Sequence, residues 1–153
     1  MRSLSVALLL LLAIAPASAQ SALPTEKIVV DTKAGPRAFT VEIAADAKTR
    51  ERGLMFRKHM DAGAGMLFDF QEPQLVDFWM ENTILPLDML FVRKDGTIAN
   101  IAANAVPFSR DTIPSDGAIQ VVIEINGGLA RKLGIAPGQT VHAAQLHNMA
   151  RAK

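Results

Sequence analysis

The chain has 153 residues, of which half are hydrophobic and a fifth are charged, with no cysteine and a formal net charge of +1. This composition is typical of a globular domain with a packed core, and the near-neutral charge gives no electrostatic basis for binding nucleic acid. The absence of cysteine excludes disulfides, thiolate metal sites and a cysteine nucleophile.

The first 19 residues are predicted to be a cleaved signal peptide. Arg2 precedes an apolar run over 6–14, and Ala17-Ser18-Ala19 supplies a small-x-small cleavage site. This run is much shorter than the roughly 20 apolar residues needed to cross a bilayer. We therefore expect export to the periplasm or the medium, one β-rich domain over 20–153, and no stable membrane insertion after cleavage.

The chain after the signal peptide begins with a predicted hairpin. Residues 27–33 and 38–43 are rich in β-forming residues and are separated by Gly35-Pro36, which favours a turn. A short helix is expected over 46–54, because Asp46 can cap its start and Gly53 can end it.

The middle of the chain contains four further strand candidates, over 65–70, 76–82, 87–93 and 97–103. Asp95-Gly96 predicts a tight turn between the last two. The stretch 104–117 has no clear period and is expected to be a long loop.

The last third of the chain is predicted to contain a strand, a helix and a strand. Residues 119–126 alternate with Val121, Ile123 and Ile125 on one face, which indicates a half-buried strand. Gly127-Gly128 is expected to open a short helix that ends at Gly134, and 140–147 to form the last strand. Seven or eight short strands with two short helices favour a mainly antiparallel sandwich or a partly open barrel.

Several segments together resemble one known family. They are RGLMFR (52–57), GMLF (65–68), FWMENT (78–83), PLDMLFV (86–92) and VIEINGGLARKLGI (122–135). In order and spacing they are similar to domain-of-unknown-function family 192. The resemblance implies a small, often exported, compact β-rich protein of unestablished activity. The chain departs from the family at Glu81, where a basic residue is common, and at Gly138-Gln139, where Gly-Asp is usual.

The densest cluster of polar residues lies in the segment 77–88. If 76–82 is a strand, Asp77 and Trp79 share one face, while Phe78 and Met80 enter the core. The short connection that follows would return the chain as a hairpin and bring Asp88 close to this strand.

This hairpin would line a polar cleft with Trp79, Asn82 and Thr83 as ligand-binding residues. Asp77 and Asp88 are the candidate general acid and base. The alternative is structural, because Asn82, Thr83 and Asp88 can all hydrogen-bond to backbone amides and build the turn.

Arg52 and Arg57 are further candidates for ligand binding. A guanidinium can hold a ligand carboxylate with two parallel hydrogen bonds, or can pair with an acidic residue of the segment 77–88. A solvated basic face is the alternative.

The methionines and His59 raise the question of a copper site, because thioethers and imidazole suit cuprous copper. The methionines concerned are Met55, Met60, Met66, Met80 and Met89, and most lie in apolar runs typical of a core. His142 and His147 would face opposite ways in a strand, which disfavours zinc. We therefore expect no metal and no cofactor.

Three functions remain open. The first is a binding or accessory module with a polar cleft near the 77–88 hairpin and a small polar ligand. The second is a metal-independent enzyme that acts on a polar or saccharide-like substrate through its two aspartates. The third is a cell-envelope adaptor that docks another protein through exposed Trp79 and Phe108.

Overall fold

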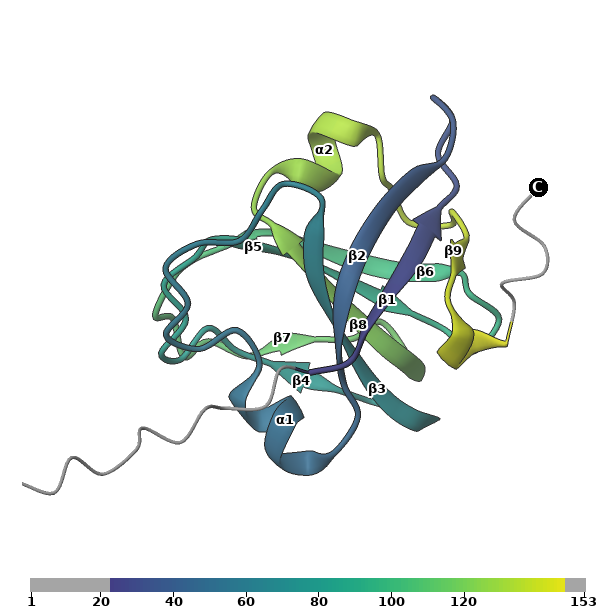
Figure 1. Ribbon diagram of the computed structural model, residues 1–153. Helices are drawn as coiled ribbons and strands as arrows, with labels where there is room; N and C mark the ends of the chain where they lie inside the picture. The colour runs from purple at the N-terminus through teal and green to yellow at the C-terminus, as the bar shows by residue number, and fades with distance from the viewer. Residues whose placement is uncertain (1–22, 148–153) are drawn as a thin grey trace, which may run out of the picture.

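The computed structural model describes residues 23–147, which form nine strands, two short α-helices and one 3-10 helix (Figure 1). The strands are β1 (Thr25–Val30), β2 (Arg37–Ala44), β3 (Ala64–Gln74), β4 (Asp77–Phe78), β5 (Leu87–Val92), β6 (Ile98–Ala105), β7 (Ile113–Pro114), β8 (Ile119–Asn126) and β9 (Val141–His142). The helices are α1 (Ala47–Arg52), α2 (Leu129–Leu133) and the 3-10 helix η1 (Ala144–Leu146).

Seven strands form one curled sheet in the order β6-β5-β8-β3-β2-β1-β9, and β4 and β7 form a separate ribbon. All neighbouring pairs are antiparallel except β2 and β3. The two ends of the sheet approach each other, because Thr97 bridges Thr140 just before β6 and β9. The chain is therefore a mainly β half-barrel, which confirms the predicted fold class.

The central strands β3, β5 and β8 have apolar residues on both faces. One face packs Leu67, Leu90 and Ile123 into a core that α2 and η1 also contact. The other face packs Phe68, Phe91 and other side chains against the turn after α1 and against the β4–β7 ribbon. Residues on this second face are thus covered by short, irregular segments rather than by a second large sheet.

The elements defined by local signals are confirmed. β1 and β2 form the predicted hairpin. Asp46 caps α1 by accepting a hydrogen bond from the Thr49 amide at 2.9 Å, and Gly53 ends the helix. The helix α2 follows Gly128 and stops at Gly134, as expected.

Two strand predictions and one loop prediction need correction. The strand expected over 76–82 is only Asp77–Phe78, because the chain then turns, with the Thr83 amide bonded to the Met80 carbonyl. The strand expected over 140–147 ends at His142 and continues as η1. The loop expected over 104–117 contains the end of β6 and all of β7.

The predicted 77–88 hairpin is also wrong. β4 pairs with β7, and β5 lies between β6 and β8 in the large sheet. Residues 80–83 instead bond to the loop after β6, where the Met80 amide donates to Ser109 and Thr83 accepts from the Phe108 amide, and to the segment after α1, where Asn82 accepts from Phe56.

The predicted signal peptide over 1–19 lies outside the described residues. Within residues 23–147, no helix has the length and apolar content that a membrane span requires.

Candidate functional site

Glu124 is a carboxylic acid in the middle of an apolar surface. It lies on β8, where its register partners are Met66 on β3 and Met89 on β5. Directly paired residues point to the same face of a sheet, so Glu124 is flanked by two methionine side chains. Glu124 is only 4% exposed, and both methionines are fully buried.

Glu124 was not among the site residues predicted from the sequence. Residues 119–126 were predicted to be a half-buried strand with Val121, Ile123 and Ile125 on one face, whereas β8 is buried on both faces. The available signal was a single carboxylate inside the apolar run IQVVIEIN. A strand buried on both faces reads as a nearly continuous apolar run, so its one acidic residue must be buried too.

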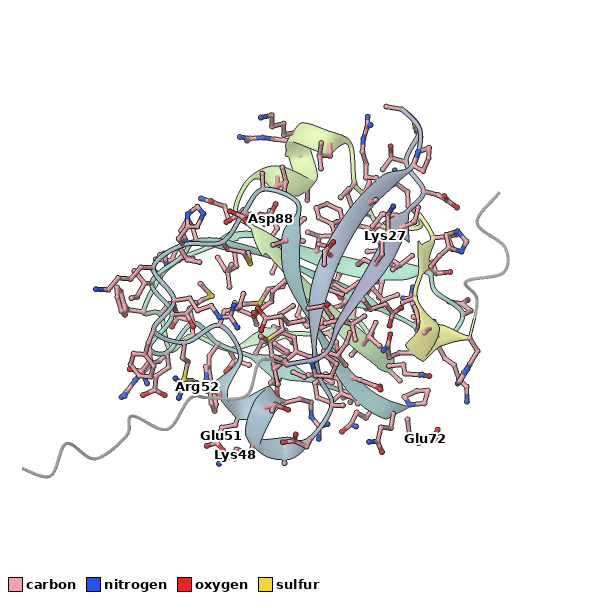
Figure 2. All side chains as sticks on the ribbon, viewed as in Figure 1. Lys27, Lys48, Glu51, Arg52, Glu72 and Asp88 are labelled. Atoms are coloured by element: carbon pink, nitrogen blue, oxygen red, sulfur yellow. The ribbon has the colours of Figure 1, made fainter. Side chains whose placement is uncertain are left out.

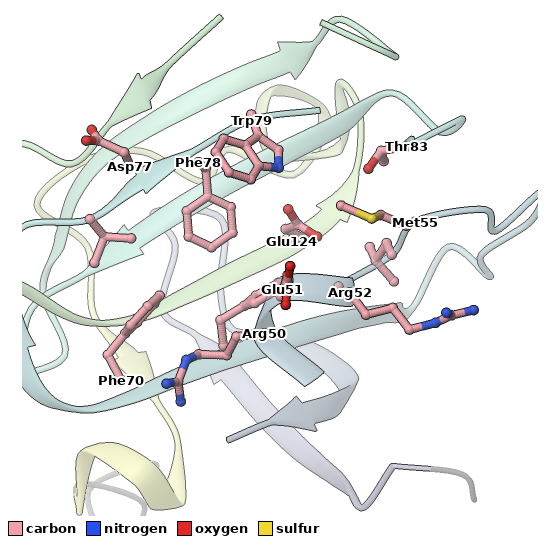
Figure 3. Close-up of a pocket in the computed structure, with 14 residues that line it drawn as sticks. Arg50, Glu51, Arg52, Met55, Phe70, Asp77, Phe78, Trp79, Thr83 and Glu124 are labelled. Atoms are coloured by element: carbon pink, nitrogen blue, oxygen red, sulfur yellow. The ribbon is translucent and has the colours of Figure 1, made fainter. Parts of the chain in front are cut away.

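The Glu124 side chain lines a pocket of about 200 Å³ that opens beneath Trp79. Figure 3 shows its carboxyl group among Met55, Phe78 and Trp79. The rest of the lining is largely apolar or aromatic, with charged side chains that come from α1 and β4: Arg50, Glu51, Arg52 and Asp77. The pocket thus lies where one face of the sheet, α1 and the β4 segment meet.

Burial raises the pKa of Glu124 from 4.5 to about 8, and this desolvation is the cause of the shift. Among the described residues, no hydrogen bond to its carboxyl group is found. Buried polar groups are normally hydrogen-bonded, so an unbonded carboxyl that faces a pocket calls for an explanation. With this pKa, Glu124 is mainly protonated at pH 7 and can donate one hydrogen bond into the pocket.

Three residues beside this pocket have a strained backbone. Phe56, Asn82 and Phe108 have φ angles of 63°, 56° and 62°, in the left-handed region that non-glycine residues rarely adopt. The Phe56 amide bonds to Asn82 and the Phe108 amide to Thr83, so the three belong to neighbouring loops. Strained residues of this kind cluster at binding and catalytic sites.

The two candidate aspartates have different surroundings. Asp77 is exposed at the pocket edge. Asp88 is fully buried beside α2, away from Glu51 and Arg52 at α1 (Figure 2). Its Oδ1 accepts from the amides of Asn104 at 2.6 Å and Gly128 at 2.8 Å, and its Oδ2 accepts from Ala130 at 2.7 Å. Asp88 therefore has the structural geometry that was the alternative in the sequence analysis.

The other candidate site residues also fall into two groups, those that line the pocket and those that do not. Trp79, Thr83 and Arg52 line the pocket with Glu124, whereas Asn82 and Arg57 do not. Arg57 instead forms a bidentate ion pair with Glu42, with both N–O distances at 2.5 Å. Within the described part of the chain, neither Arg52 nor Arg57 pairs with an acid of the segment 77–88, where Glu81 pairs with Arg110.

A larger pocket, of about 480 Å³, lies on the other side of the segment that follows α1. Its carboxylates already have partners, because Glu42 pairs with Arg57 and Asp46 caps α1. The pocket over Glu124 is therefore the better candidate, since its central polar group is free to meet a ligand.

No group of three or more His, Asp or Glu side chains in residues 23–147 could hold a metal ion. Met66, Met80 and Met89 of the considered copper site lie in the core at 0% exposure. His142 contacts Asp31 at 2.7 Å and η1 separates it from His147.

Residues 28–143 match the model of domain-of-unknown-function family 192 (DUF192), described as "Uncharacterized ACR". The chain belongs to this family. No curated protein matches this DUF192 chain.

Two solved structures resemble the DUF192 chain over most of its length. One is from Sinorhizobium meliloti 1021 and is provisionally named a transcription regulator. It has 43% identity and a TM-score of 0.80, and the match covers 82% of this chain and 98% of that one. The other is a protein of unknown function from Novosphingobium aromaticivorans DSM 12444, with 42% identity, a TM-score of 0.79 and coverages of 86% and 94%.

Proposed function

We propose that this protein is a binding module that holds a small, largely apolar molecule in the pocket over Glu124. The observation that carries the proposal is the Glu124 carboxyl group, which is buried, unbonded among the described residues and exposed to the pocket. A ligand with one polar group would give this carboxyl its missing partner while its apolar part contacts Leu54, Phe78 and Trp79. Small-ligand sites commonly combine apolar walls with a few such polar groups.

The pocket also differs from the polar cleft expected between two aspartates. Asp88 is not among the lining residues, and its two oxygens accept three backbone hydrogen bonds. The geometry therefore gives no support to an acid/base pair of Asp77 and Asp88.

The binding proposal is tested by protein-observed NMR with a panel of small alcohols, amides, amines and acids. The Met55 methyl group and the Trp79 indole are suitable reporters, since both residues line the pocket and Trp79 is the only tryptophan of the chain. We expect at least one class of compound to shift both signals in the unchanged protein and in Glu81→Gln, whose carboxylate lies outside the pocket lining. The same compounds should bind at least tenfold more weakly to Glu124→Gln. Compounds that bind Glu124→Gln as tightly, or a panel that leaves both signals unmoved, would contradict the proposal.

A second candidate function is docking of another envelope protein. Four large apolar side chains of the loops around the pocket are more than half exposed: Phe56, Trp79, Val106 and Phe108. Clusters of this kind mark interaction surfaces. A photo-crosslinking side chain at position 108 should yield one discrete adduct in intact cells, and the same group at exposed Glu72 should yield none. Equal products from both positions would count against docking.

We also propose that the protein acts outside the cytoplasm, on the basis of the signal-peptide pattern over 1–19. Expression in a bacterial host should give an exported form whose N-terminal residue is Gln20. A cytoplasmic product that retains residues 1–19 would contradict export.

A further inference from the structure

The walls of the pocket over Glu124 are unusually rich in aromatic rings. Phe68, Phe70, Phe78 and Trp79 all line it. Phe78 contacts Phe68 edge to face, with ring centroids 5.0 Å apart, and contacts Phe70 in the same manner at 6.3 Å. These contacts hold the rings in place before any ligand arrives.

Aromatic faces and a carboxylate attract the same kind of ligand. The face of an aromatic ring carries partial negative charge, and rings arranged around a small site bind substituted ammonium ions. A buried carboxylate also needs a cation to balance its charge. A ligand carboxylate would instead meet Glu124 and the electron-rich rings, so the lining disfavours an anion.

The charged residues at the pocket do not supply that cation. Arg50 donates to the carbonyls of Ala45 and Asp69, at 2.5 and 2.8 Å, and its guanidinium lies over Phe70. The Arg52 guanidinium lies 5.9 Å from the centre of the Phe56 ring. No ion pair joins Glu124 to either arginine in residues 23–147.

We propose that the ligand of this pocket is a small organic ammonium ion, held by the aromatic walls and balanced by the Glu124 carboxylate. This inference rests on the proposed function, since it specifies the ligand class of the same pocket. The alkyl groups of such an ion would lie against Phe78 and Trp79, and Asp77 and Glu51 offset the positive charge of Arg50 and Arg52 at the edge.

Binding of the ammonium ion must be coupled to loss of a proton. In the empty pocket Glu124 is protonated at pH 7, because burial raises its pKa to about 8. The cation selects the ionised form, so one proton moves from the Glu124 carboxyl to solvent for each ion bound. The strands beside Glu124 present Met66 and Met89, which do not titrate, and the other charged groups at the pocket are Arg50, Glu51, Arg52 and Asp77.

The test compares choline with its neutral carbon isostere, 3,3-dimethylbutan-1-ol, which has the same shape without the charge. Binding is followed by Trp79 fluorescence at pH 6.5 and pH 9, in the full exported domain. We expect choline to bind at least tenfold more tightly than the isostere at pH 9. The choline affinity should be about thirtyfold lower at pH 6.5 than at pH 9, and Glu124→Gln should lose both effects while Glu81→Gln keeps them.

Two results would overturn the inference. If the isostere binds as tightly as choline at pH 9, or if Glu124→Gln keeps the choline affinity and its pH dependence, the ligand is not an ammonium ion. The binding function would survive such a result if a compound from the NMR panel still occupies the pocket in a Glu124-dependent manner. If no compound shifts Met55 and Trp79, both proposals fail.

Discussion

Two acidic residues within 23–147 are buried, and their different surroundings distinguish a structural role from a functional one. Asp88 is surrounded by backbone N–H donors that bind its two oxygens. Glu124 has methionines on both sides and a pocket in front. A satisfied buried carboxylate holds the fold together, whereas an unsatisfied one is maintained at a cost in stability.

The structural role of Asp88 predicts a large loss of stability on Asp88→Asn. The amide group that replaces one oxygen cannot accept, so at least one buried backbone N–H loses its charged partner. We expect the free energy of unfolding in urea to fall by about 3 kcal/mol. Asp77→Asn is the matched control, because Asp77 is exposed, and it should change stability by less than about 0.5 kcal/mol. Similar losses for the two variants would contradict the assigned roles.

The sequence could show that 77–88 was rich in polar residues but could not separate these roles. Trp79, Thr83 and Arg52 line one pocket, and their role in ligand binding stays a prediction. Asp88 and Arg57 were also candidates, yet their partners, Ala130 and Glu42, lie far away in sequence. The neighbours of a side chain depend on which distant segments of the chain come together, and residue types alone do not specify this.

At the scale of elements, the signals that worked are local. Asp46 begins α1 and Gly53 ends it, through hydrogen bonds to residues no more than four positions away. The strand over 76–82 failed because its β-forming residues are followed by a turn at Asn82, which is held by distant loops. Short edge segments of this kind depend on tertiary contacts more than on propensity.

The turn into α2 provides an element-scale prediction. A Cβ at Gly127 would lie 2.7 Å from Asn104 Oδ1 and 2.9 Å from the Pro86 carbonyl, whereas a Cβ at Gly128 meets open space. Gly128 has φ +79°, so Gly128→Ala should cost about 1–2 kcal/mol of backbone strain. Gly127→Ala should cost more, since the Pro86 carbonyl that the new Cβ would meet accepts the Gly127 N–H at 2.8 Å, and this backbone must move. Thermal unfolding of both variants measures which loses more stability. A smaller loss of stability for Gly127→Ala than for Gly128→Ala would contradict the close approach at Gly127.

At the scale of the whole molecule, the sequence predicted the class of fold but not its strand order. Alternating and apolar runs indicate strands, which is why the β-rich half-barrel could be expected. The parallel pairing of β2 with β3, and the position of β8 between β5 and β3, join segments far apart in the chain. The apolar run around Glu124 signals its burial, but the residues that surround it follow from this strand order.

This burial also makes the stability of the whole molecule depend on pH. The folded-state pKa of Glu124, about 8, is above its ordinary value of 4.5, so the folded protein holds an extra proton between these values. Its contribution to stability is therefore complete below about pH 4.5 and is lost as the pH rises through 8. Relative to Glu124→Gln, the free energy of unfolding of the unchanged protein should fall by about 1 kcal/mol per pH unit between pH 5 and pH 7.5. A difference between the two proteins that stays constant over this range would contradict the shifted pKa.

The most direct test of the account is the titration of Glu124 itself. The ¹³C chemical shift of its side-chain carboxyl carbon can be followed by NMR from pH 4 to pH 10, and Glu124→Gln identifies the signal. We predict a titration midpoint near pH 8 and a lower midpoint when an ammonium ligand occupies the pocket. A midpoint near 4.5 would mean that Glu124 is ionised and solvated at neutral pH, and would contradict a protonated acid buried at the centre of the site.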